Sequence, residues 1–220
     1  MTDPNRSHIS LIVDRTGSMQ TIRTDAEGAV NAFIKDQQKE DLPCSILLAD
    51  FDDHEPFRMV YDGELKGCPD YTLVPRGSTP LLDAIGKGIS LTGERLAAKP
   101  EAERPGKVFF VIQTDGQENS SKEWTLEKVV EAIKRQESVF AWTFIFLGAG
   151  KDAWASSQMF KGTNMFANVV RGGVTGQSVA ATYSVTSSNL RAARAGAQGV
   201  NYAVVVDDEG KVTPEPPKQA

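Results

Sequence analysis

Three short polar segments of the sequence carry side chains that could bind a ligand together. They are Asp14 to Ser18, the triplet Ser78-Thr79-Pro80, and Thr114-Asp115-Gly116. We place each segment at the end of a strand and just before a helix. In an open parallel sheet the carboxyl ends of the strands lie along one edge, and ligands bind in the crevice there. We therefore expect these segments, which are far apart in the sequence, to converge on one site.

The side chains of the three segments share one coordination chemistry. They offer carboxylate and hydroxyl oxygens but no sulfur and no imidazole, and the set is Asp14, Thr16, Ser18, Thr79 and Asp115. Hard oxygen ligands suit Mg²⁺, Mn²⁺ or Ca²⁺ and disfavour zinc. A mixed shell of hydroxyls and waters favours Mg²⁺ over Ca²⁺. The sequence therefore predicts a divalent-cation site made of these side chains, with no catalytic residue and no organic cofactor.

Each segment also has a simpler interpretation. The residues of the first segment could cap the helix that follows, because Asp, Ser and Thr are favoured N-caps. Thr79 could do the same for a helix that opens at Pro80, and Asp115-Gly116 could be a turn. The occurrence of all three segments in this order, each at a strand end, favours the metal site over these separate roles.

Apolar runs indicate the strands that position these segments. Residues 9–13, apart from Ser10, and residues 108–112 are apolar, which is typical of strands buried on both faces of a sheet. Residues 45–51 and 57–61 are separated by a short polar turn, which predicts an antiparallel hairpin. Strands alternate with helical patterns along the chain. The sequence thus predicts an α/β fold: a doubly wound, mainly parallel sheet with one antiparallel edge strand and helices on both faces.

The second half of the chain continues this alternation. Ser120 and Glu123 form a capping-box pair, which predicts a helix start. The later elements that we expect are a strand at 139–147, a short helix at 153–159, a strand at 165–169 and a helix at 174–195. We assign the domain to residues 8–200 and expect an edge hairpin and a flexible C-terminal tail in residues 201–220.

The three segments resemble the motifs of von Willebrand factor A domains, in particular of bacterial and phage-type members. Asp-Arg-Thr-Gly-Ser-Met at 14–19 resembles the Asp-x-Ser-x-Ser segment of that family. Gly-Ser-Thr-Pro-Leu at 77–81 resembles its threonine loop, and Thr-Asp-Gly-Gln-Glu-Asn at 114–119 resembles its second aspartate loop. The similarity spans about residues 8–195. One departure is Thr16, which stands where the family usually has Ser and keeps the hydroxyl.

The resemblance implies a Rossmann-like fold with a metal-ion-dependent adhesion site and no enzymatic activity. Its metal shell would be formed by Asp14, Thr16, Ser18, Thr79 and Asp115, some of them acting through water. The function expected is metal-dependent protein binding, as an adhesion or adaptor module, in which a protein partner supplies an Asp or Glu to the cation. We expect five residues at the rim of the site: Arg15, Met19, Arg76, Gln117 and Glu118.

The alternative function is a Mg²⁺-dependent phosphohydrolase that uses the same strand-end aspartates. Thr16 stands where such an enzyme would need a second carboxylate. Gly148-Ala149-Gly150-Lys151 lacks the spacing of a phosphate loop. A metal could also be held by the run Asp52-Asp53-His54-Glu55, but a solvated hairpin turn is the favoured interpretation.

The composition excludes several classes of function. The net charge of −5 leaves no electrostatic footprint for nucleic acid or an anionic membrane. The segment Met1 to Ser7 has no apolar signal core, and no apolar stretch approaches the roughly 20 residues of a membrane helix. We expect Cys44 and Cys68 to be free thiols, and the protein to be cytoplasmic.

Overall fold

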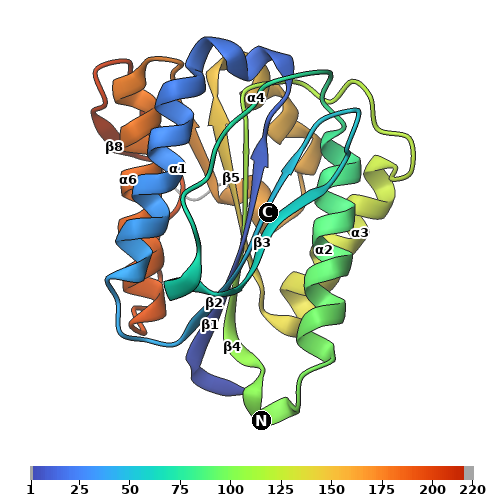
Figure 1. The fold of residues 1–220 in the computed structure, drawn as a ribbon, viewed down its shortest axis with the longest axis vertical. Coiled ribbons are helices and arrows are strands. Elements are labelled where there is room, and N and C mark those ends of the chain that lie inside the picture. Colours follow the sequence, from blue (N-terminus) through green and yellow to red (C-terminus); the bar gives the residue numbers. More distant parts are fainter. Residues whose placement is uncertain (1, 216–220) are drawn as a thin grey trace.

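The computed structural model describes residues 2–215 of the chain. One eight-stranded sheet runs through the molecule, and helices cover both of its faces (Figure 1). The strands are β1 (Asp3–Asp14), β2 (Cys44–Phe51), β3 (Arg58–Glu64), β4 (Pro105–Thr114), β5 (Thr143–Ala149), β6 (Val169–Gly172), β7 (Val204–Val206) and β8 (Val212–Pro214). Their order across the sheet is β3-β2-β1-β4-β5-β6-β7-β8.

The pairing of the strands confirms the predicted doubly wound, mainly parallel sheet. All neighbours from β2 to β7 run parallel, whereas β3 pairs antiparallel with β2 at one edge. At the other edge β8 pairs antiparallel with β7, so both edges end in an antiparallel strand. The sheet therefore continues past residue 200, while the domain boundary predicted there stays a prediction. Residues 216–220 of the predicted tail lie outside the described residues.

Helices pack on the two faces in separate groups. The α-helices are α1 (Arg23–Gln38), α2 (Leu81–Ala97), α3 (Leu126–Phe140), α4 (Gly150–Ser157), α5 (Asn164–Ala167) and α6 (Gly176–Arg194). Short 3₁₀ helices are η1 (Gly17–Ile22), η2 (Leu65–Gly67), η3 (Glu101–Glu103) and η4 (Gln158–Phe160). Helices α1 and α6 bury one face of the sheet, and α2, α3 and α4 bury the other. No helix in residues 2–215 is long and apolar enough to cross a membrane.

Strand β1 shows how the sequence pattern builds two cores at once. Successive side chains of a strand point to opposite faces. Leu11 and Val13 accordingly join the cluster on the α1 face, and Ile12 joins the cluster on the α2 face. Because helices cover both faces of the sheet, residues 11–13 are apolar without alternation. Cys44 and Cys68 are buried and free, as predicted.

Two predicted boundaries in the second half are wrong, for identifiable reasons. The strand expected from Val139 begins only at Thr143, because α3 continues to Phe140 and ends at Ala141 in the left-handed conformation (φ 53°). The β-branched and aromatic residues there favoured a strand, but Val139 and Phe140 remain exposed at the end of the helix. Similarly, α5 occupies the start of the strand expected at 165–169, and β6 begins at Val169.

The predicted capping box of Ser120 and Glu123 is also wrong. Helix α3 begins at Leu126, and its N-cap is Thr125, whose side chain accepts a hydrogen bond from the Lys128 amide. The buried carboxylate of Asp83 on α2 accepts the backbone N–H groups of residues 122–124. These bonds hold the preceding segment as a loop, so the helix starts later than the local sequence suggests.

The buried histidine of β1 gives a testable pH dependence. His8 Nδ1 lies 2.8 Å from Ser45 Oγ, and Nε2 lies 3.1 Å from Ser10 Oγ. Burial, together with nearby cations, lowers the pKa of His8 from 6.5 to about 3. The unfolded chain therefore binds a proton below about pH 6.5 that the folded protein does not bind. Stability must then fall as the pH drops from 6.5 towards 3.

We predict that His8 alone lowers the free energy of unfolding by about 2 kcal/mol at pH 5 relative to pH 7. Urea denaturation at the two pH values measures this difference, which His8→Gln should largely remove. The matched control is His54→Gln, which changes the other histidine, exposed in the β2–β3 turn. An unchanged pH slope in His8→Gln would contradict the prediction.

Candidate metal centre

The three polar segments meet where the sheet changes winding direction. β1 lies between β2 and β4, and the chain proceeds from β1 to one side and later returns on the other. Asp14 is the last residue of β1, and Asp115 follows the last residue of β4 directly. Thr79 lies just before α2. This is the position at which doubly wound sheets bind their ligands.

Four of the five predicted ligand side chains are joined by hydrogen bonds across the three segments. Thr79 Oγ1 donates to Thr16 Oγ1 at 3.3 Å, and Thr16 Oγ1 lies 3.1 Å from Ser18 Oγ. Ser18 Oγ in turn donates to Asp115 Oδ1 at 2.7 Å. Gly116 lies against this chain, since a Cβ placed on it would come within 3.2 Å of Thr79 Oγ1. Their oxygens therefore gather in one place.

The fifth side chain, Asp14, lies beside this group at the base of the site. Its Oδ1 accepts the Thr16 amide at 2.7 Å, and its Oδ2 accepts the Thr114 hydroxyl at 2.5 Å. Asp14 is 0% exposed. Burial raises the pKa of Asp14 from 3.8 to about 7, against the effect of these hydrogen bonds, and the nearby charge of Asp115 raises it further. Burial also raises the pKa of Asp115.

The residues present fit a divalent cation. Among the ion pairs of residues 2–215, none involves Asp14 or Asp115, and the adjacent Arg15 is paired elsewhere. A buried carboxylate without a counter-charge is costly, and a cation at the site would supply that charge. No group of three or more His, Cys, Asp or Glu that could hold a metal occurs in the described part of the chain. Such a cation would thus rely on hydroxyls and water besides the two carboxylates.

Helix capping does not account for the hydroxyls. Thr16 stands at the N-cap of η1, but its side chain makes no capping hydrogen bond. The N-cap residue of α2 is Pro80 and not Thr79. The hydroxyl groups of Thr16 and Thr79 bond to each other instead, so the capping interpretation is wrong for both.

A residue that the sequence reasoning missed holds Thr79 in place. The Thr79 amide donates to Asn119 Oδ1 at 2.8 Å, and the Asn119 amide donates to the Thr79 carbonyl at 3.1 Å. This reciprocal pair joins the second segment to the third. The only indication in the sequence was an amide side chain at the end of the run 114–119.

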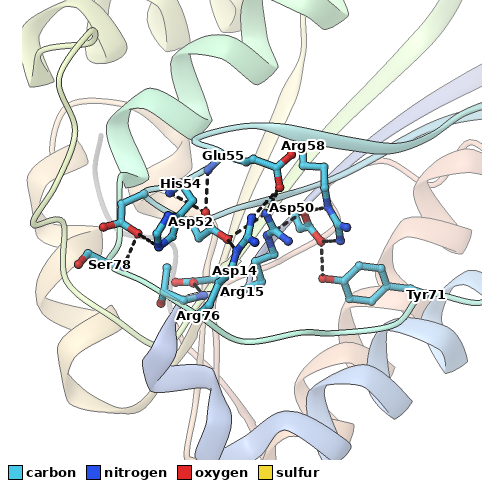
Figure 2. A network of polar contacts seen from close by, with 12 residues as sticks. Asp14, Arg15, Asp50, Asp52, His54, Glu55, Arg58, Tyr71, Arg76 and Ser78 are labelled. Carbon is cyan, nitrogen blue, oxygen red and sulfur yellow. Dashed lines mark hydrogen bonds and ion pairs between the residues drawn. The ribbon is translucent and has the colours of Figure 1, made fainter.

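The predicted rim of the site is partly wrong. Arg15 and Met19 are buried, with exposed fractions of 2% and 0%. Arg76 and Gln117 are exposed as expected, and Glu118 is half-buried. The Arg15 side chain points towards the β2–β3 turn, where it contacts Asp52 and Glu55 (Figure 2).

The β2–β3 turn is solvated at His54 and Glu55, as the sequence suggested, but not at Asp52. Asp52 is completely buried, and its Oδ2 lies 2.9 Å from the Arg15 guanidinium. Arg15 also contacts Glu55 at 2.6 Å. An arginine placed in the first polar segment therefore neutralises carboxylates of another loop, which the local sequence does not reveal.

Comparison with known proteins identifies the fold. No family model matches the sequence, and no curated protein matches it. Among solved structures, a von Willebrand factor type A protein from Catenulispora acidiphila matches with a TM-score of 0.57 and 17% identity, over 85% of this chain and 42% of that one. The pilus adhesin SpaC from Lactobacillus rhamnosus GG matches with a TM-score of 0.63 and 14% identity, over 86% and 30%.

A third match is proximal thread matrix protein 1 from the mussel byssus, described with a zinc-occupied MIDAS (metal-ion-dependent adhesion site) motif. Its TM-score is 0.53 and its identity 14%, over 84% of this chain and 45% of that one. This chain spans less than half the length of each of these three structures. At such low identity the likeness establishes the fold alone: the chain has the fold of von Willebrand factor A domains.

Proposed function

We propose that this protein is a metal-dependent protein-binding module, which coordinates an acidic residue of a protein partner through a divalent cation. Asp14, Thr16, Ser18, Thr79 and Asp115 would hold the cation. The observation that carries this proposal is the fully buried Asp14 carboxylate, which forms no ion pair within residues 2–215 and lies beside a hydrogen-bonded chain of three hydroxyls and the Asp115 carboxylate.

The cation would supply a positive charge with an open coordination position for an acidic side chain. The fold supports the proposal, since one protein with this fold is described as a pilus adhesin and another with a zinc-occupied MIDAS motif. Zinc in that mussel protein shows that affinity alone does not exclude it from such a site. Our preference for Mg²⁺ or Mn²⁺ rests on the oxygen-only ligands.

We also propose that the protein is not an enzyme. The phosphohydrolase alternative has no specific observation in its favour. Thr16, at the position where a second carboxylate would stand, bonds to the hydroxyls of Ser18 and Thr79. The absence of nucleic-acid and membrane partners and the cytoplasmic location stay predictions from the sequence.

The first prediction for this site concerns the metal. Isothermal titration with MgCl₂ or MnCl₂ should find one site per chain, and Asp14→Ala should weaken the affinity by at least about 100-fold while the protein stays folded. The control is Asp152→Asn, which changes an exposed carboxylate near Asp115 that is bonded to Gln117 and lies outside the ligand set. Equal affinity in wild type and Asp14→Ala would refute the assignment.

A second prediction uses the stability of the metal-free protein. The raised pKa of Asp14 means that its contribution to stability is present below pH 3.8 and lost as the pH rises through about 7. In EDTA at pH 8, Asp14→Asn should therefore raise the free energy of unfolding, on the order of 1–3 kcal/mol. In saturating Mg²⁺ the wild type should be the more stable of the two proteins, because only the wild type gains the full free energy of Mg²⁺ binding. A destabilised Asn variant in EDTA would contradict this.

A third prediction concerns the partner. Peptides selected from a displayed library on the Mg²⁺-loaded protein should contain an Asp or Glu that is essential for binding. Replacing it with Asn or Gln, adding EDTA, or introducing Thr79→Ala should each weaken binding at least about tenfold, measured by fluorescence anisotropy. Thr213→Ala, on the opposite edge strand β8, is the matched control. Binding that is indifferent to EDTA and to Thr79→Ala would move the recognition surface elsewhere.

A further inference from the structure

The turn between β2 and β3, residues Asp52 to Glu55, contacts two segments of the candidate metal centre, through Arg15 and through Ser78 (Figure 2). The buried Asp52 carboxylate makes this turn rigid from inside. Its Oδ1 accepts the backbone amides of His54 and Glu55, both at 2.7 Å. The backbone of the turn is thus held by a side chain inside it.

Arg15 links the turn to the first polar segment, Asp14 to Ser18. Arg15 stands between Asp14 and Thr16 in sequence, and its guanidinium contacts Asp52 at 2.9 Å and Glu55 at 2.6 Å. The same guanidinium lies 3.3 Å from Asp50 at the end of β2. Arg15, Asp50 and Asp52 are buried, and buried charges are stable only when they are paired in good geometry.

The turn also forms hydrogen bonds with the loop that carries Thr79. Asp53 Oδ1 accepts the Ser78 amide at 3.0 Å. Arg76 Nε donates to Asp52 at 2.6 Å, and its Nη2 donates to Glu55 at 2.7 Å. The fit is close, because a Cβ on Gly77, whose φ is +69°, would lie 2.0 Å from Asp53 Oδ1.

This loop needs such support from outside. From Cys68 to Pro80 the chain forms neither helix nor strand. Two backbone hydrogen bonds, from Arg76 to Arg15 and from Gly17 to Gly77, join it to the first segment. Bonds to α1, to Asn119 and to the turn hold it from other sides. A hydroxyl ligand such as Thr79 contributes to a metal site only when its loop is held in place.

We propose that the Asp52–Glu55 turn is a positioning element of the metal centre, and that Asp53 acts through the Ser78 amide to set the Thr79 hydroxyl against Thr16. The inference rests on the proposed function, because it assigns a role towards the same cation. Asp53 is a positioning residue and is not itself a metal ligand.

The test compares Asp53→Ala with Asp53→Asn by titration with MnCl₂ at fixed pH and ionic strength. Alanine removes the acceptor for the Ser78 amide, so Mn²⁺ affinity should fall about 3- to 10-fold. Asparagine keeps a side-chain oxygen at that place, so affinity should stay within about twofold of wild type. Glu64→Ala, at the far end of the same hairpin, is the control and should change nothing.

A double-mutant cycle separates positioning from general destabilisation. In the Thr79→Ala background, Asp53→Ala should weaken Mn²⁺ binding by less than about twofold, because the hydroxyl it positions is gone. Thermal unfolding checks that each variant is folded. If Asp53→Ala does not fold, Arg76→Gln takes its place and should behave in the same way, since it removes the bonds to Asp52 and Glu55.

Three results would overturn the inference. Equal loss in Asp53→Asn and Asp53→Ala would show that the charge matters and not the hydrogen bond. Wild-type affinity in Asp53→Ala, or full additivity with Thr79→Ala, would show that the turn does not position the hydroxyl. Mn²⁺ binding that needs Asp14 and Thr79 but not Asp53 contradicts only this inference, whereas a wild-type protein that binds no Mn²⁺ refutes the proposed function as well.

Discussion

The buried charge of Asp14 is the constraint around which this edge of the sheet is arranged. The residue ends the central strand β1 with neighbours on both sides, so its carboxylate has no access to water. Hydrogen bonds from Thr16 and Thr114 stabilise the charged form, yet burial outweighs them and the pKa of Asp14 remains raised. A group held in this state has a strong electrostatic preference for a nearby cation. The hydroxyls of Thr16, Ser18 and Thr79 and the Asp115 carboxylate lie nearby and could supply such a cation with further oxygens.

At the end of the neighbouring strand β2, arginine side chains balance the charge of the buried carboxylates. Asp50 and Asp52, at the end of β2, are as deeply buried as Asp14, but arginines contact both. Burial by itself would raise the pKa of Asp52, and hydrogen bonds from Arg76 and the turn amides outweigh it, so that this pKa is lowered. Two adjacent strand ends thus differ in one respect. The end of β2 has arginine counter-charges, whereas no ion pair within residues 2–215 involves Asp14, at the switch point of the sheet.

The sequence predicted the parts of the fold and site that depend on local pattern. Continuous apolar runs identified β1 and β4, and residue type together with order identified the oxygen side chains that converge. Partners that are distant in sequence could not be predicted in this way. Arg15 looked like a rim residue because nothing near it shows that Asp52 will lie 2.9 Å away. The start of α3 was misplaced for the same reason, since Asp83 on another helix holds the preceding loop.

The fixation of Thr79 bears on how the site would respond to a partner. Its loop is held on one side by the reciprocal bonds with Asn119 and on the other by the bonds from the β2–β3 turn to Ser78 and Arg76. A shift of Thr79 towards or away from a cation would break several of these bonds together, each worth about 0.5–1.5 kcal/mol. If the site holds a cation, exchange of a cation-bound water for a partner's carboxylate would break none of them. The described contacts therefore favour a preorganised protein shell, in which the exchangeable position belongs to solvent and the ligand loops stay in place.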